Sequence, residues 1–150
     1  FVMMQKFYNS EESKRKFELL RENQKQALPI RLQAYERMVL LLERINPAHL
    51  LLRVAPIGKS KDDYATLLTH QIQTEFEHNL SQQIYLTAET WHVILKAKNS
   101  TVQMIRKQAL RDEVVDADKM REAIMLELTE VEAPSAIAIS FIKEELKRVF

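Results

Sequence analysis

The stretch "PIRLQAYERMVLLLERIN", residues 29–46, carries the strongest helical pattern in the chain. Two apolar stripes run along it. The first has the 4-3-4 spacing of a coiled-coil seam and comprises Leu28, Leu32, Tyr35, Val39 and Leu42. The second lies beside it and comprises Met38, Leu41 and Ile45. A helix that is apolar over so much of its circumference is central to a domain or is shared with a partner. Asn46-Pro47 ends it, because the residue before a proline avoids helical geometry.

The composition agrees with a helical fold. The chain has 150 residues, enough for one domain, with one glycine, four prolines and no cysteine. So few turn-forming residues argue against an all-β fold, and the abundant Lys, Glu, Gln, Leu and Ala are good helix formers. The absence of cysteine excludes disulfides, thiolate nucleophiles and thiolate metal sites. We therefore predict an all-α domain.

Further helices follow the 29–46 segment. "AHLLLRV" (48–54) suits either a helical turn after an Asn cap or a short buried strand. "APIGKSKDD" (55–63) is a loop in which Ser60 and Asp63 form a start resembling a capping box. Helical spacing then predicts a helix to about Ile84, a second one capped by Thr87 and ending near Leu110, and a third capped by Asp116 or Asp118. A last helix starts at Pro134 and runs to the end, so the bundle holds about five helices.

The segment before this bundle reads as a stalk. "SEESKRKFELLRENQKQ" (10–26) is strongly helical, but it is polar nearly all round. Such a helix is solvated or bridges two bodies. Pro29 removes a backbone donor and crowds the preceding turn, which predicts a kink or a restart there. We therefore assign residues 1–27 to a membrane-proximal stalk and residues 28–150 to the bundle.

The N-terminal residues suggest the edge of a membrane. The apolar run Phe1-Val2-Met3-Met4 and the aromatic pair Phe7 and Tyr8 precede the basic cluster Lys14-Arg15-Lys16. This order is typical of the cytoplasmic end of a transmembrane helix. Four residues cannot span a bilayer, which takes about 20 apolar residues, so the anchor would lie upstream of Phe1. The alternatives are a frayed helix start or a linker, with the basic residues solvated or drawn to anionic lipid headgroups.

Two Glu-x-x-His motifs raise a metal-site hypothesis: Glu75 with His78, and Glu89 with His92. Helical bundles of the ferritin-like type hold two iron ions with such motifs and two further glutamates, for which Glu36 and Glu43 are available. Residues advance about 100° around a helix. His78 is therefore about 200° from the core residue Phe76, and Glu89 is equally far from Trp91. One member of each motif thus faces away from the apolar face, which favours two solvated pairs over a metal site.

No other motif points to a reaction. His49 and His70 lack a neighbouring catalytic constellation, and the single glycine rules out a glycine-rich phosphate loop. The net charge of +1 argues against a dedicated nucleic-acid binder. We therefore predict no catalytic residue, no metal, no cofactor, no nucleic acid and no small-molecule substrate.

Two stretches, "LPIRLQAYERMVLLLERINPAHLLLRV" (28–54) and "EFEHNLSQQIYLT" (75–87), resemble an uncharacterised family of Bacteroidota proteins, a domain of unknown function. Its members look like one N-terminal transmembrane helix, a charged stalk and a compact helical domain. The resemblance implies an anchor just before Phe1 and carries no activity, cofactor or catalytic residue.

The resulting functional hypothesis is an anchored interaction domain. We expect a single-pass protein of the inner (cytoplasmic) membrane whose helical domain faces the cytoplasm. The 28–46 helix would bind either a second copy of the chain or a subunit of a membrane complex. The rival hypothesis is a metal-dependent, di-iron-like bundle enzyme that uses the two Glu-x-x-His pairs.

Overall fold

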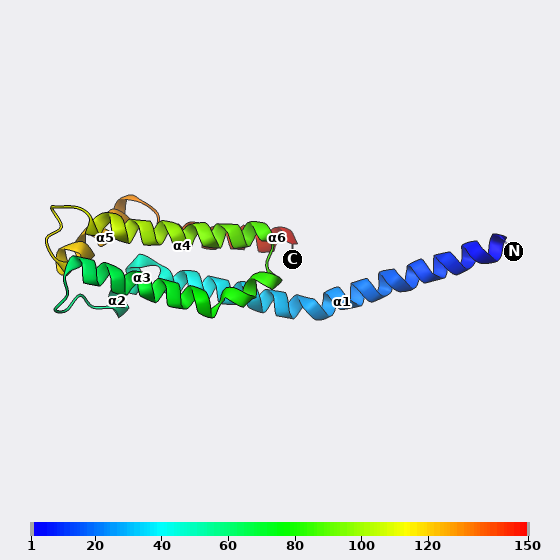
Figure 1. The fold of residues 1–150 in the computed structure, drawn as a ribbon. Coiled ribbons are helices and arrows are strands. Elements are labelled where there is room, and N and C mark those ends of the chain that lie inside the picture. The colour runs from blue at the N-terminus through cyan, green and yellow to red at the C-terminus, as the bar shows by residue number, and fades with distance from the viewer. Residues whose placement is uncertain (1, 150) are drawn as a thin grey trace.

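The computed structural model describes the backbone of residues 2–149 and the side chains of residues 11–23 and 25–148. It consists of helices joined by short loops, and no strand occurs within that range (Figure 1). In chain order the elements are α1 (Val2–Ile45), α2 (Pro47–Arg53), α3 (Lys61–His78), the 3-10 helix η1 (Leu80–Tyr85), α4 (Ala88–Ala109), α5 (Ala117–Glu130) and α6 (Pro134–Val149). The predicted all-α fold is confirmed, and in the segment 48–54, for which helix and strand were both open, residues 48–53 belong to helix α2 and Val54 is its C-cap.

The helix starts lie where the sequence predicts them. In each case an oxygen of the cap side chain accepts a hydrogen bond from a backbone N–H in the first turn. Four caps act in this way: Asn46 on Ala48 (3.0 Å), Ser60 on Asp63 (3.1 Å), Thr87 on Thr90 (3.2 Å) and Asp116 on Lys119 (2.8 Å). Of the two candidates for the start of α5, Asp116 is therefore the cap.

One predicted boundary is wrong. The helix expected to reach about Ile84 ends at His78, and the chain continues as η1. The side-chain amide of Asn79 donates a hydrogen bond to the carbonyl of Glu75 at 2.9 Å, which satisfies one of the free acceptors of the last turn. No residue of η1 is buried, so the tighter helix follows the surface of the bundle.

The helix α1 is both an arm and a part of the core. It is continuous through Pro29, so the chain does not restart there, and Figure 1 shows it changing direction where it leaves the bundle. Every described side chain from residue 11 to residue 30 is exposed, and the first buried one is Ala34. The predicted arrangement of a stalk followed by a bundle is therefore confirmed.

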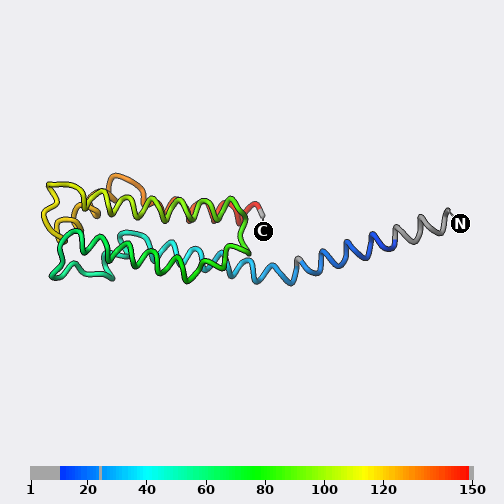
Figure 2. The backbone as a smooth tube through the Cα atoms, viewed as in Figure 1, coloured from blue at the N-terminus to red at the C-terminus, as the bar shows by residue number. Residues whose placement is uncertain are grey.

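The core runs along the whole bundle. The end at which α1 leaves is called the base here, and the opposite end the far end. Figure 2 shows α3 running from the far end to the base, α4 returning to the far end, and α6 returning to the base. The helix α4 packs against α6 and α3, and α1 packs against α6. The largest fully buried side chains include Tyr35, Met38, Leu41, Leu42, Ile45, Tyr64, Leu68, Ile72, Ile94 and Ile105.

Aromatic contacts join α3 to α4, and a buried tyrosine hydroxyl joins α3 to the end of α2. Phe76 of α3 stacks on Trp91 of α4 with ring centroids 5.4 Å apart, and the ammonium of Lys98 lies 4.8 Å from the centre of the Phe76 ring. The hydroxyl of Tyr64 donates a hydrogen bond to the carbonyl of Val54 at 2.6 Å, and burial raises the pKa of this tyrosine. The end of α2 is thereby held on α3.

Within the described range, no helix is both long enough and apolar enough to cross a bilayer. The run Phe1-Val2-Met3-Met4 and the pair Phe7 and Tyr8 lie outside the residues whose side chains the structure describes.

Candidate interaction surfaces

The two Glu-x-x-His motifs do not converge. Glu75 lies on α3 and its Oε1 atom is 2.7 Å from Nε and 2.6 Å from Nη2 of Arg44, so it ties α3 to α1. His78, Glu89 and His92 are exposed. Nowhere in the described chain do three or more His, Asp or Glu side chains gather in a way that would hold a metal ion. The arrangement required by the di-iron hypothesis is therefore not present among these residues.

The other glutamates and histidines considered in the sequence analysis, Glu36, Glu43, His49 and His70, lie apart from these motifs. Nδ1 of His49 lies 2.8 Å from the carbonyl oxygen of Glu43 and 3.4 Å from its Oε2, so the pair fastens the turn between α1 and α2. Glu36 is exposed. His70 lines a shallow cleft of about 400 Å³ between α3 and α4, together with Lys98 and Arg106. The two cationic residues are eight positions apart on α4, or about 12 Å along its axis, so they do not converge on one small anion.

A buried carboxylate that the sequence reasoning missed lies near the base. Glu145 of α6 is buried, and its Oε1 accepts a hydrogen bond from the hydroxyl of Thr87 at 2.6 Å. The buried hydroxyl of Thr90 donates to its Oε2. Helical spacing could have predicted the burial of Glu145, because it follows the buried Ala138 and Ile142 on the same face of α6. Its partners are hydroxyls at the start of α4, so the group joins two helices.

The apolar seam of α1 is divided between the core and the surface. Tyr35 and Leu42 are buried inside the chain's own core, and Val39 packs partly against it. Leu28 and Leu32 lie nearer the base and remain more than a third exposed. Of the seam residues, only these two near the base are accessible to a partner.

A separate group of exposed apolar side chains lies where α1 leaves the bundle, on another face of α1 from these two leucines, because Ile30 is about 200° around the helix from Leu28. We call this group the junction surface, and it comprises Ile30, Ile84 and Tyr85. It borders a cleft of about 320 Å³ lined by Ala27, Ile30, Arg31, Ile84, Tyr85, Leu86 and Thr87. Ile84 of η1 is 73% exposed, although η1 packs against α1 and α3. An apolar surface of this kind on a packed scaffold is typical of a protein-binding site.

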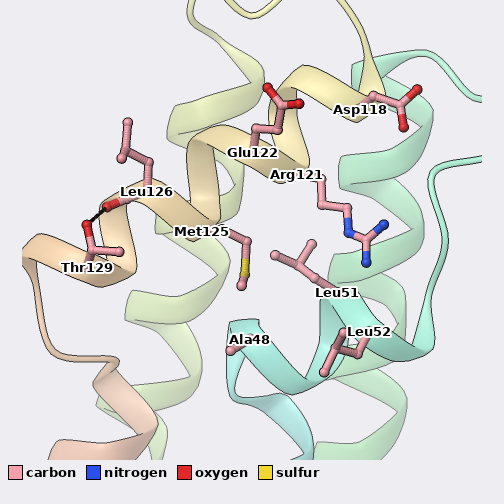
Figure 3. Close-up of a pocket in the computed structure, with 9 residues that line it drawn as sticks. All are labelled: Ala48, Leu51, Leu52, Asp118, Arg121, Glu122, Met125, Leu126 and Thr129. Atoms are coloured by element: carbon pink, nitrogen blue, oxygen red, sulfur yellow. Dashed lines mark hydrogen bonds between the residues drawn. The ribbon is translucent and has the colours of Figure 1, made fainter.

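A second apolar surface lies between α2 and α5 (Figure 3). We call it the α2–α5 groove. It has a volume of about 580 Å³ and is lined by Ala48, Leu51, Leu52, Asp118, Arg121, Glu122, Met125, Leu126 and Thr129. Figure 3 shows Met125 pointing from α5 toward Leu51 and Ala48, with Arg121 on the same side of α5. Sequence reasoning missed this groove because its two walls come from segments about 70 residues apart.

The fold and these surfaces define a class: an all-α bundle carried on a helical arm, with two apolar surfaces. The chain belongs to a family of unknown function, DUF7935, which it matches over residues 1–149. No curated protein and no solved structure matches it.

Proposed function

We propose that the chain is a tethered protein-binding domain. A membrane anchor upstream of Phe1 would hold it at the inner membrane, with α1 as a spacer and the bundle in the cytoplasm. A protein partner would bind the junction surface on the 28–46 helix and η1. In this proposal the chain binds no cofactor or small-molecule substrate and catalyses no reaction.

The exposed arm of α1 carries the proposal. Residues 11–30 span roughly 30 Å along a helix axis, and every side chain described there is exposed. The same helix continues into the core, where Met38 and Leu42 are fully buried. An arm that is rooted in the core transmits position and orientation, which a flexible linker does not. This is the property expected of a spacer between a surface and a binding domain.

The charges of the arm agree with a membrane at its outer end. Lys14, Arg15 and Lys16 are exposed. Residues 1–53 hold ten Lys/Arg against six Asp/Glu, a net charge of +4. Basic residues next to a membrane helix mark its cytoplasmic side and are attracted by anionic lipids. This supports the proposed orientation.

The junction surface supports the proposed partner. Ile30 is 49% exposed at the root of the arm, and Ile84 of η1 is 73% exposed. Ile84 and Ile30 line the same cleft from η1 and α1. A partner helix that placed apolar side chains against these residues would remove them from water, which is the usual mode of helix recognition in a groove. The position at the root of the arm fits a partner held in the same membrane.

The test uses the full-length protein with its native upstream segment. We expect it in the membrane fraction after washes with high salt and with alkaline carbonate. Release by high salt alone would mean that attraction to lipid headgroups, and not a membrane anchor, holds the protein at the membrane. Recovery of the protein in the supernatant without any wash would contradict the proposed membrane attachment. Cross-linking and co-purification should then identify a partner that Ile84→Glu and Ile30→Glu lose. The matched control is Leu110→Glu, at an exposed leucine outside this surface, which should retain the partner.

A further inference from the structure

The α2–α5 groove exposes apolar side chains that an isolated bundle would not need to expose. Leu52 is 73% exposed, Leu126 is 65% exposed and Met125 is exposed to a smaller degree. Met125 and Leu126 lie away from the ends of α5, so fraying at a helix end does not account for their exposure, and Leu52 lies in the last turn of the short helix α2. Full burial of a leucine side chain stabilises by about 1.5–3 kcal/mol. The groove therefore offers binding energy to whatever covers it.

The rim of the groove carries both charge signs. Asp118 and Arg121 are three residues apart on α5, at a spacing that permits an ion pair. Within the described part of the chain, however, neither forms a hydrogen bond or an ion pair, and Glu122 has only Lys119 at 3.4 Å. Arg121 is half-buried beside the apolar centre. A guanidinium and a carboxylate that are unpaired on one surface can each pair with the opposite group on a second copy.

We propose that the α2–α5 groove binds the α2–α5 groove of a second copy of this chain. Two identical surfaces fit each other around a twofold axis when each offers both the hollow and the protrusion, and both charge signs. Here the hollow over Leu51 and Met125 is bordered by Leu52 and Leu126, which are 73% and 65% exposed. The wall leucine of one copy enters the hollow of the other, and Arg121 of each copy meets a carboxylate at the other's rim.

The position of the groove is compatible with two anchored copies. Figure 3 shows α5 and α2 crossing in front of other helices of the bundle, so the groove opens sideways. Figure 1 places α2 and α5 toward the far end, away from the arm. A twofold axis along the bundle would therefore leave both arms pointing the same way. The junction surface stays open, so the dimer and the proposed partner can be tested independently.

The size of the groove predicts a weak dimer. Nine residues line it, whereas a stable interface of standard size uses about 20–30 residues on each side. We expect a dissociation constant on the order of 50 µM for the 150-residue chain in solution. If the tether proposed above is correct, confinement to a membrane raises the effective concentration enough for such a dimer to form.

Sedimentation equilibrium of the 150-residue chain, up to about ten times the expected dissociation constant, tests the dimer. The wild type should shift from monomer to dimer. Leu52→Glu and Leu126→Glu should remain monomeric with unchanged circular dichroism, since both side chains are exposed. The matched control is Ile84→Glu, an equally exposed apolar residue on the junction surface, which should still dimerise.

Charge exchange tests the arrangement of the two copies. Arg121→Glu and Asp118→Lys should each weaken the dimer about tenfold, and the double variant should recover most of the loss. A wild type that stays monomeric over the whole range overturns the inference, and so does a dimer that survives Leu126→Glu but is lost in Ile84→Glu. A dimer that is insensitive to all of these variants also overturns it. Binding of anionic vesicles or of an unrelated protein by a monomeric chain would show that another occupant uses the groove only if Leu126→Glu abolishes that binding, and this result would overturn the inference.

Discussion

The side-chain hydroxyl of Thr90 donates a hydrogen bond to the carboxylate of Glu145, which lies 55 residues further along the chain, and both side chains are buried. The hydroxyl of Thr87 donates to the other carboxylate oxygen at 2.6 Å. The carboxylate thus lies at the N-terminal end of α4, where the helix dipole favours negative charge. A polar group that is buried without a hydrogen-bond partner costs free energy, and the two hydroxyls supply the partners that this buried group needs.

Thr90→Val should therefore destabilise the fold. The substitution keeps the shape of the side chain but leaves the buried carboxylate one donor short, which costs about 1–3 kcal/mol. The matched control is Thr66→Val at an exposed helical threonine, which should change the stability by less than about 0.5 kcal/mol. Urea denaturation of the purified chain measures both. Equal effects of the two substitutions would contradict the assigned role of the hydrogen bond.

Replacing both partners with apolar residues separates the hydrogen bond from the packing. Thr90→Val combined with Glu145→Leu removes the donor and its acceptor together, so no buried acceptor is left unpaired. We expect the double variant to be more stable than the sum of the two single effects implies. Strict additivity would show that the two side chains do not interact.

The sequence was sufficient for the parts of the fold that depend on local rules. Ser60 and Thr87 were recognisable as caps, and Asp116 was one of two candidates, because a short side chain with a hydrogen-bond acceptor precedes an apolar helical pattern. The buried position of Glu145, in contrast, was not predicted from the sequence. Its spacing from Ile142 placed it on the buried face of α6, but a glutamate is rarely buried, and its two threonine partners lie on another helix.

The division of the α1 seam could not be derived from local spacing. Tyr35 and Leu28 occupy equivalent positions in the 4-3-4 pattern, yet one is buried and the other is more than a third exposed. The difference depends on how far the other helices extend along α1 toward the base, which is a property of the assembled bundle. The α2–α5 groove is likewise created by tertiary packing.

Two leucines on α1 should respond very differently to truncation. Leu42 is fully buried and Leu40 is 60% exposed, although only one residue separates them. Leu42→Ala leaves a cavity and should cost about 2–5 kcal/mol, whereas Leu40→Ala should change stability by less than about 0.5 kcal/mol. Guanidinium denaturation measures both. A large loss for Leu40→Ala in a monomeric sample would show that this face of α1 is covered by another part of the chain.

Substitution of the buried Ser135 should not destabilise the fold. Its hydroxyl is fully buried in the first turn of α6 and has no hydrogen-bond partner among the residues described. Because the folded state gains no hydrogen bond for this desolvated group, Ser135→Ala should leave the stability unchanged or raise it by up to about 1 kcal/mol. The exposed Ser140→Ala is the control. A clear loss of thermal stability in Ser135→Ala alone would reveal a partner for the hydroxyl.

The carboxylate of Glu127 should make part of the stability depend on pH. Burial acts to raise its pKa, but hydrogen bonds from Lys107 and Gln108, the latter at 2.8 Å, outweigh burial and lower the pKa below the ordinary value of 4.5. A carboxyl with a lowered pKa contributes stability above its unfolded pKa, and this contribution is lost as the pH falls through its folded pKa. Wild type should exceed Glu127→Gln in stability at pH 7, and the difference should shrink below about pH 4.5. Urea denaturation from neutral pH to pH 3 measures this, with the exposed Glu130→Gln as the control. A difference that stays constant over this range would mean that the ionised carboxylate does not stabilise the contact between α4 and α5.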